Sequence, residues 1–473
     1  MSVTPGPPND MSSPPRPAGR ATTHALPTPH GTVTPRADLR RLWAGFAVSE
    51  LGSAVGSGAL PLIAILALHA SQWQVSLLAA VAGIASAAVV VPLGPFVEFH
   101  RKRPVMIGAD LLRFAALGSL PVAAACHALT YPQLCLVAVA HTGATIVFTA
   151  ASTAHLKTLV PVADRAAANS RFATTAWTAT TVGPPIGGQL VSVLGATAAV
   201  AVDAVSFLAS AVSIRRLRGP EPPPPPPGGN RRRGGEVLAG WRYITHHSGL
   251  HRLFWNAMLF GGSLTAASPL MAVFMLRDLG LHPWQYGLAL GLPGLGGIAG
   301  SLAVTSLARR YGSRPVLLAS GVARSLWLGL VPLAPHGTGG LVLITVSDTL
   351  LLACAGVFNP TFVTYRMDAT SDAHMARVNA AWAVSSKSVQ PLFIAAAGLL
   401  ATATSVRTAL AVAALTLAAS ALLLPWRADK AGAGTAAIRG DQWSRTGAGR
   451  GGSTATGHAA AGTGPRRSVP EDT

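Results

Sequence analysis

Apolar runs of about twenty residues, broken by short polar turns, recur from residue 42 to residue 426. A run of this length can cross the hydrocarbon core of a bilayer as a helix. The first six predicted spans are 42–68, 74–97, 104–126, 132–154, 167–193 and 197–214. The next six are 253–276, 284–308, 315–334, 340–363, 377–402 and 406–426. The pattern therefore predicts an all-α membrane protein with twelve transmembrane helices in two six-helix halves.

One stretch of the chain occurs twice. A shift of 211 positions without a gap aligns the segment 73–121 with the segment 284–332. Identical pairs include Trp73 and Trp284, Gln74 and Gln285, Arg103 and Arg314, Pro104 and Pro315, and Arg113 and Arg324. In each copy two apolar runs flank a basic turn. Parallel duplication of such a hairpin is typical of transporters built from two halves.

Polar segments flank and separate the two halves. We expect a disordered cytoplasmic tail over 1–40, an N-terminal half over 41–214, a cytoplasmic linker over 215–252, a C-terminal half over 253–427 and a disordered cytoplasmic tail over 428–473. The linker contains a polyproline run, Pro222 to Pro227, and then apolar residues at helical spacing. We expect the run to be a stiff spacer, with a ligand for a proline-binding domain as the alternative. The following segment predicts an amphipathic helix on the membrane surface.

Composition excludes a water-soluble globular protein. Half of the residues are hydrophobic and only 11% are charged, whereas soluble domains have about 25% charged residues. The formal net charge is +19, but the basic residues are spread over short loops and tails. This distribution favours contact with lipid head groups and excludes nucleic acid as a partner.

Basic residues also predict the orientation of the chain. They concentrate in the turns after even-numbered spans, whereas the odd-numbered turns contain chiefly Arg277 and Arg407. Basic loops stay on the cytoplasmic side, so both termini are expected there. The excess of Arg over Lys and the abundance of Ala and Gly are typical of a GC-rich bacterial genome, and we expect a multi-pass protein of the plasma membrane.

Sequence motifs for catalysis or cofactors are absent. The chain has no Walker-type phosphate loop and no His-Glu-x-x-His zinc motif. The three cysteines have no metal-binding spacing and are expected to act as small hydrophobic residues. A disulfide between Cys126 and Cys135, which flank one predicted turn, is the alternative. We therefore expect neither an enzyme, nor a cofactor, nor a metal site.

Twelve spans, a long central loop and basic turns after spans 2 and 8 together resemble the major facilitator superfamily over about residues 40–427. The turn after span 2 matches the family's loop motif at Gly94, Glu98, Lys102 and Arg103, but departs from it at neighbouring positions. The resemblance implies that the acid at Glu98 caps or pairs across the cytoplasmic face and holds a gate shut. A plain solvated turn is the simpler alternative.

Span 5 contains a second motif, at Gly183, Pro184, Gly187 and Gly188. It resembles the antiporter signature of the superfamily's drug exporters, although Ala179 replaces an earlier glycine. Prolines interrupt backbone hydrogen bonding and glycines allow a second helix to approach, so packing of small residues is the simpler alternative. Short phrases in spans 1, 3 and 6 resemble exporters of macrolides and siderophores.

Four polar residues are candidates for proton coupling or substrate contact. A charge at membrane depth costs about 2.5–3.5 kcal/mol on insertion scales, so each one needs a partner, a water-filled cavity or a function. Glu50, near mid-depth in span 1, is the first candidate for carrying a proton, and Asp348 in span 10 is the second. Lys387 in span 11 could pair with either of them, and His141 in span 4 could relay a proton or contact substrate. A purely structural salt bridge to Lys387 and a structural histidine are the alternatives.

Four other charges are expected to be structural. Asp110 and Arg113 stand three residues apart and can pair on one helix face. Arg324 repeats Arg113, but the position that matches Asp110 is a glycine. Asp203 lies in span 6, which in this fold supports the bundle from outside.

Together these features predict a secondary active transporter that exports an amphipathic small molecule, such as a drug, antibiotic or siderophore, by proton antiport and alternating access. Its partners would be the substrate, protons and the bilayer, and we expect a monomer. An importer or uniporter of a metabolite on the same fold is one alternative. A membrane sensor or scaffold that transports nothing is another.

Overall fold

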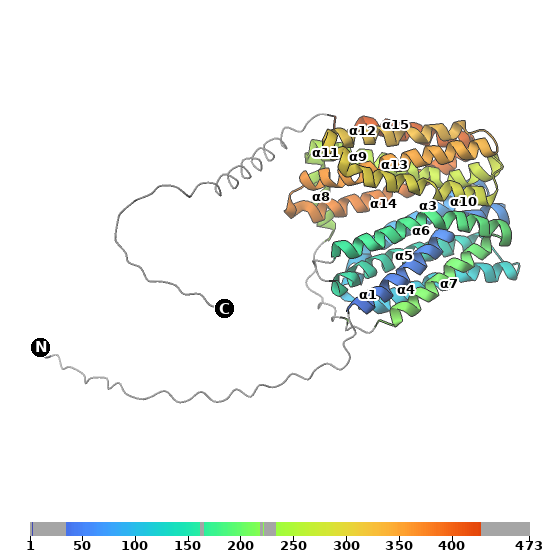
Figure 1. The fold of residues 1–473 in the computed structure, drawn as a ribbon, viewed down its shortest axis with the longest axis horizontal. Coiled ribbons are helices and arrows are strands. Elements are labelled where there is room, and N and C mark those ends of the chain that lie inside the picture. Colours follow the sequence, from blue (N-terminus) through green and yellow to red (C-terminus); the bar gives the residue numbers. More distant parts are fainter. Residues whose placement is uncertain (1, 3–34, 161–164, 218–220, 222–232, 427–473) are drawn as a thin grey trace, which may run out of the picture.

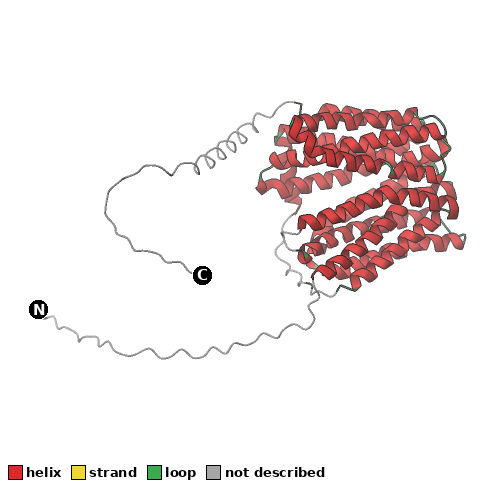
Figure 2. Cartoon of the chain, in the orientation of Figure 1, coloured by secondary structure: helices red, strands yellow, loops and turns green. Residues whose placement is uncertain are grey.

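The computed structural model describes residues 2, 35–160, 165–217, 221 and 233–426. Within these ranges the regular secondary structure is helical and no strand is present (Figure 2). The polyproline run and the predicted C-terminal tail lie outside the described residues.

Six long helical segments form the N-terminal half. The first span consists of α1 (Pro35–Val55), α2 (Ala59–Leu62) and the π-helical turn η1 (Ile63–Ala67). The next five are α3 (Gln72–Phe99), α4 (Lys102–Ala125), α5 (Tyr131–Leu159), α6 (Arg165–Leu194) and α7 (Ala196–Arg215).

The C-terminal half follows the short helix α8 (Arg233–His246). Its spans are α9 (Ser248–Val273) with η3 (Phe274–Asp278), α10 (Pro283–Gly291) with α11 (Pro293–Tyr311), and α12 (Ser313–Leu326) with η4 (Trp327–Leu333). The last three are α13 (Thr338–Asp368), α14 (Asp372–Ala403), and α15 (Val406–Ser420) with η5 (Ala421–Leu423).

Eleven of these segments are long and apolar enough to cross a membrane, and α6 is not among them. Threonines, glycines and the pair Pro184 and Pro185 lower the hydropathy of α6. It is nevertheless 30 residues long and packs between α1 and α10. The helix therefore completes the predicted set of twelve, and the all-α membrane fold is confirmed.

The two halves lie side by side, with the N-terminal half in blue to green and the C-terminal half in yellow to orange (Figure 1). They meet along two helix pairs, α3 with α14 and α6 with α10. Helix α8 packs on α14 and α9, so the linker helix belongs to the C-terminal half. We call the end of the bundle at α8 the linker end, and the opposite end the remote end.

The duplication extends to details of the backbone. The π-helical turns η1 and η3 each have five residues, and every residue of η3 lies 211 positions after its counterpart in η1. After each turn, the side chain of Gln74 or Gln285 accepts a hydrogen bond from the backbone N–H of Ser71 or His282, at 2.7 and 2.8 Å. In both halves the chain thus reverses direction at the remote end through the same π-helical turn and the same glutamine hydrogen bond.

Two predicted domain boundaries lie several residues from the observed ones. The first span begins at Pro35, inside the predicted tail, and there Asp38 is buried and paired with Arg41 at 3.0 Å. Helix α9 begins at Ser248, inside the predicted linker. The helix predicted in the linker is present, but its tight packing on α14 at Gly240 anchors it to protein. All three cysteines are free, so the alternative of a disulfide is wrong.

Candidate functional site

A cavity of about 320 Å³ lies inside the N-terminal half, between α1, α4, α5 and α6. Three aromatic rings, those of Phe46, Phe148 and Phe172, line it together with several serine and threonine hydroxyls. The Phe46 and Phe172 ring centroids are 4.9 Å apart. The predicted residues Glu50, Arg113 and His141 share this cavity, although they come from three different helices.

Glu50 projects into the cavity from α1. The first candidate span runs from Ala37 to Ala67, so Glu50 stands near its middle, as predicted. Its side chain is partly exposed, and among the described residues it has no hydrogen bond or ion pair. An ionisable group in such a place can exchange a proton with the cavity without first breaking an internal bond.

A second charged group of the cavity, Arg113, belongs to a buried ion pair. Arg113 on α4 is 4% exposed and pairs with Asp110 one turn earlier, as its spacing predicted. Its guanidinium also lies over the rings of Phe148 and Phe207, at 4.4 and 4.0 Å from the centroids. Aromatic faces stabilise a buried cation, so Arg113 is held by a carboxylate and by two rings.

Asp203 links two helices of the same half. Its carboxylate accepts a hydrogen bond from the Ser53 hydroxyl at 3.1 Å, which joins α7 to α1. A side-chain carbon at Gly56 would lie 2.8 Å from Asp203, so the glycine is needed for this approach. The structural role of Asp203 stays a prediction.

His141 lies on α5 between the cavity and the core. Its ring centroid is 5.8 Å from that of Phe207, and its Nδ1 atom is buried without a hydrogen-bond partner. A buried polar atom without a partner is costly unless water or a ligand completes it. His141 also lines the cavity, so its ring is placed to contact whatever fills it.

The C-terminal half holds its corresponding arginine without an acid. Arg324 on α12 donates a hydrogen bond to the Asn256 side chain at 2.8 Å and lies over the rings of Phe260 and Phe358, at 3.7 and 3.4 Å. At the position that matches Asp110, a side chain on Gly321 would clash with Phe358. We did not identify Asn256 from the sequence, although a lone asparagine inside an apolar run was its signal.

Asp348 lies in a separate and mostly apolar cavity of about 240 Å³, between α9, α10, α11 and α13. Met271, Met275 and Leu351 are among its neighbours there. No hydrogen bond or ion pair of Asp348 is present in the described part of the chain. Glu50 and Asp348 therefore occupy two different cavities, one in each half.

Lys387 does not join either carboxylate. Its side chain is exposed on α14, and it lines neither of the two cavities. The salt bridges found among the described residues are those of Arg41 with Asp38 and of Arg113 with Asp110. The predicted pairing of Lys387 with Glu50 or Asp348 is thus not formed in this structure.

The glycines of the second motif lie at close helix contacts. A side-chain carbon at Gly183 would lie 2.3 Å from Ala54 on α1. A side-chain carbon at Gly187 would lie 2.0 Å from the carbonyl oxygen of Val55, also on α1. At Gly188 it would lie 2.6 Å from the Pro283 carbonyl, and at Gly287 it would lie 2.3 Å from the Pro184 carbonyl. The motif therefore lets α6 lie close to α1 within its own half. It also lets α6 lie close to α10 at the interface between the two halves, which we call the seam.

The basic turn of the first motif has an unexpected partner. The Glu221 carboxylate accepts hydrogen bonds from the backbone N–H groups of Lys102 and Arg103, at the start of α4. The Arg103 guanidinium donates to the Leu217 carbonyl at 3.2 Å. Gly94 and Glu98 belong to α3, but the contacts of these two residues are outside the described part of the structure. The gate role of Glu98 stays a prediction.

A family model of the major facilitator superfamily matches residues 42–384 and 253–456. Together these matches cover most of the chain, and both structural halves lie within them. The chain belongs to the major facilitator superfamily. It is therefore a membrane-embedded transporter of small molecules and not an enzyme, as predicted.

Solved structures of several transporters share the fold. A bacterial homologue of the iron transporter ferroportin, in an inward-facing state, is 15% identical with a TM-score of 0.68, over 82% of this chain and 98% of that one. The nucleoside transporter NupG is 14% identical with a TM-score of 0.64, over 81% and 97%. A POT family transporter in complex with 5-aminolevulinic acid is 14% identical with a TM-score of 0.64, over 82% and 95%. No curated protein sequence gives a significant match.

Proposed function

We propose that this major facilitator protein exports an amphipathic small molecule in exchange for protons, by alternating access. It would work as a monomer in the plasma membrane of a bacterium, with both termini in the cytoplasm. Solved relatives named for iron and for nucleosides share the fold, so the proposal depends on the cavity and not on the fold.

The observation that carries the proposal is the unpaired carboxyl of Glu50 in the cavity of the N-terminal half. Arg113 is already neutralised by Asp110, which leaves Glu50 as the carboxyl group of the cavity lining whose charge can change. Phenyl rings and hydroxyls around it suit a substrate with an apolar body and a polar group. Protonation of Glu50 from one side and deprotonation on substrate binding from the other would couple the two movements.

Proton-driven transport in inverted membrane vesicles tests this proposal. A pH gradient is imposed, and lipophilic antibiotics and dyes are added to vesicles that contain the wild type, Glu50→Gln, Glu50→Asp or Asp348→Asn at matched expression. We expect at least one compound to dissipate the gradient with the wild type. Glu50→Gln should abolish this effect, because glutamine keeps the shape of the side chain but cannot carry a proton, and Glu50→Asp should retain part of it.

Two results would count against the proposal. If Glu50→Gln dissipates the gradient as well as the wild type while Asp348→Asn does not, Asp348 carries the proton. If no compound dissipates the gradient and whole cells instead take up a metabolite through the protein, the direction is wrong. The glycine motif in α6 would then serve packing alone.

A further inference from the structure

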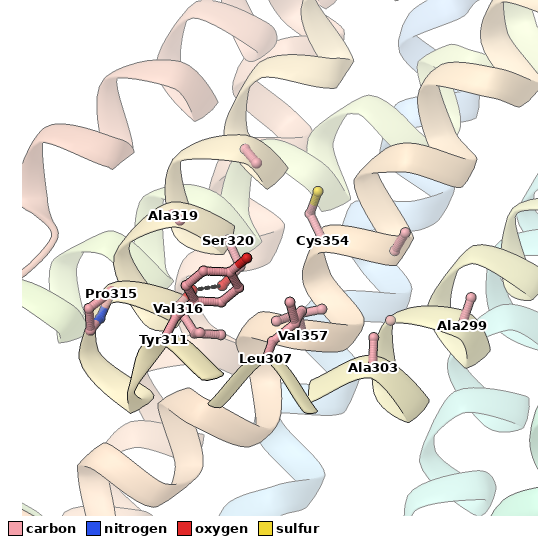
Figure 3. A pocket seen from close by; sticks show the side chains of 13 residues that line it. Ala299, Ala303, Leu307, Tyr311, Pro315, Val316, Ala319, Ser320, Cys354 and Val357 are labelled. Carbon is pink, nitrogen blue, oxygen red and sulfur yellow. Dashed lines mark hydrogen bonds between the residues drawn. The ribbon is translucent and has the colours of Figure 1, made fainter. Parts of the chain in front are cut away.

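A further hollow of the C-terminal half lies on its surface and shares no lining residue with the two acidic cavities. It is a groove of about 680 Å³ between α11, α12 and α13. Figure 3 shows side chains from the three helices around it, including Ala303, Leu307 and Tyr311 from α11, Val316 and Ala319 from α12, and Val357 from α13. Because most of these side chains are small, the three helices leave a furrow that they do not fill.

The interior of the groove has little to offer a polar ligand. Among its lining residues, only Tyr311, Ser320 and Cys354 have polar or sulfur-containing side chains. The Ser320 hydroxyl already donates to the Val316 carbonyl at 2.6 Å. A hydrocarbon chain fits these walls, since it needs no hydrogen bonds and buries apolar surface.

One end of the groove lies next to a basic turn, and Arg310 is on the groove-lining face of α11. Arg309 and Arg310 occupy the last turn of α11 and are exposed, and neither takes part in a salt bridge found among the described residues. The Arg310 guanidinium lies 5.3 Å from the centroid of the Tyr311 ring, which lines the groove and is 56% exposed. Guanidinium groups bind phosphate through paired hydrogen bonds. This end therefore suits an anionic head group.

The length of the groove matches one leaflet of a membrane. On α11 its lining runs from Ala299 to Tyr311, which is roughly 18 Å at 1.5 Å per residue. Half of a hydrocarbon core of about 30 Å is of similar depth. The basic turn would then lie at the membrane surface, with the apolar furrow extending toward the bilayer centre.

We propose that this groove binds a phospholipid with an anionic head group. One acyl chain occupies the furrow between α11, α12 and α13, and the phosphate contacts Arg310 beside Tyr311, with the charge of Arg309 in the same turn adding to the attraction. The site is separate from the Glu50 cavity, so it stands or falls independently of the proposed transport function.

Photolabelling of the purified full-length protein tests the site. Phosphatidylglycerol and phosphatidylcholine with the same diazirine-bearing acyl chain are compared in otherwise identical nanodiscs. We expect phosphatidylglycerol to label the peptides 299–311 and 315–323 about fivefold more than phosphatidylcholine. The variant Arg309→Gln/Arg310→Gln should lower this labelling to the level of phosphatidylcholine. The control Arg215→Gln/Arg216→Gln, at the linker end of α7, should leave it unchanged.

A second variant tests the furrow itself. Ala303→Phe should reduce labelling of these peptides by both lipids, because the ring occupies the space of the acyl chain. If Ala303→Phe does not fold, the arginine pair alone decides. Equal labelling by the two lipids in the wild type, or labelling that the arginine variant does not change, would overturn the proposal. Displacement of the label by a transported compound, whatever the head group, would make the groove a path for substrate and would also overturn it.

Discussion

Two arginines at matching positions of the duplication have different partners in the two halves. Arg113 and Arg324 are both buried, and both lie over two phenylalanine rings. Arg113 has a carboxylate partner, whereas Arg324 has the neutral amide of Asn256. The repeat has thus kept the cation and its aromatic support, but it has changed the group that balances the charge.

This difference leads to a prediction about stability. Arg113→Gln leaves the buried Asp110 carboxylate without its cation, and breaking such a pair typically costs about 3–5 kcal/mol. Arg324→Gln leaves only a neutral amide and should cost less. The apparent melting temperatures of the purified variants in detergent measure both effects. Adding Asp110→Asn to Arg113→Gln should recover part of the loss, because the unpaired charge is removed. Equal losses for the two arginine variants would contradict this account.

The sequence revealed some of these residues but not their surroundings. The pair of Asp110 with Arg113 follows from a spacing of three residues on one helix. The support from Asn256, Phe148, Phe207 and Phe260 depends on which helix faces are brought together, and spacing along the chain does not contain that information. For the same reason, spacing could not show that Lys387 lies away from both carboxylates in this structure, or that Glu50, Arg113 and His141 share one cavity.

At the scale of elements, apolar length predicted the helices well. The predicted spans differ from the observed ones mainly at the ends, where polar residues such as Asp38 continue a helix because tertiary contacts satisfy them. The π-helical turns η1 and η3 could not be predicted, since they are shifts in backbone hydrogen bonding that leave no mark in hydropathy. Their identical positions in the two halves nevertheless confirm the duplication that the sequence revealed.

The start of α4 carries a prediction of its own. Glu221 accepts from the first backbone N–H groups of this helix, where a negative charge also interacts favourably with the helix dipole. Glu221→Gln should therefore weaken the contact between the inter-half linker and α4. We expect faster hydrogen exchange over residues 102–106. The increase should correspond to a loss of about 0.5–2 kcal/mol in the free energy of local unfolding at the start of α4.

The duplicated helix start provides an internal control for that experiment. Helix α12 begins after Gly312 and has no side-chain cap hydrogen bond. Exchange over residues 313–317 should thus be the same in Glu221→Gln and in the wild type. Unchanged exchange at the start of α4 would show that Glu221 does not stabilise it.

At the scale of the whole molecule, contacts at the remote end hold the halves together. Arg277 of the C-terminal half donates to the Ala70 carbonyl of the N-terminal half at 2.7 Å, and the Trp284 backbone N–H donates to the Ser192 hydroxyl at 3.1 Å. Gly188 and Gly287 pack directly against each other's helices nearby. Alternating access by relative motion of the halves would require these contacts to break.

A side chain at this seam should shift the balance between conformations. In Gly188→Ala the new carbon would lie 2.6 Å from the Pro283 carbonyl oxygen, a backbone atom that cannot easily move. Spin labels are placed at Val193 and Leu333, at the remote ends of α6 and η4, in a protein whose three native cysteines are replaced by serine. We expect the distance between the labels to be longer in Gly188→Ala than in the same protein with Gly188. Gly118→Ala is the matched control, because nothing lies within 4 Å of its new carbon. A distance distribution identical to that of the wild type would show that the seam does not limit opening.

The central claim is that Glu50 exchanges a proton for substrate, and proton release from the purified protein tests it most directly. A compound identified in the vesicle assay is added to the wild type, Glu50→Gln and Asp348→Asn in weakly buffered detergent solution, and the pH change is recorded. The account predicts proton release from the wild type and from Asp348→Asn, and none from Glu50→Gln at a concentration where binding is still detected. Release from Glu50→Gln equal to that of the wild type would contradict it.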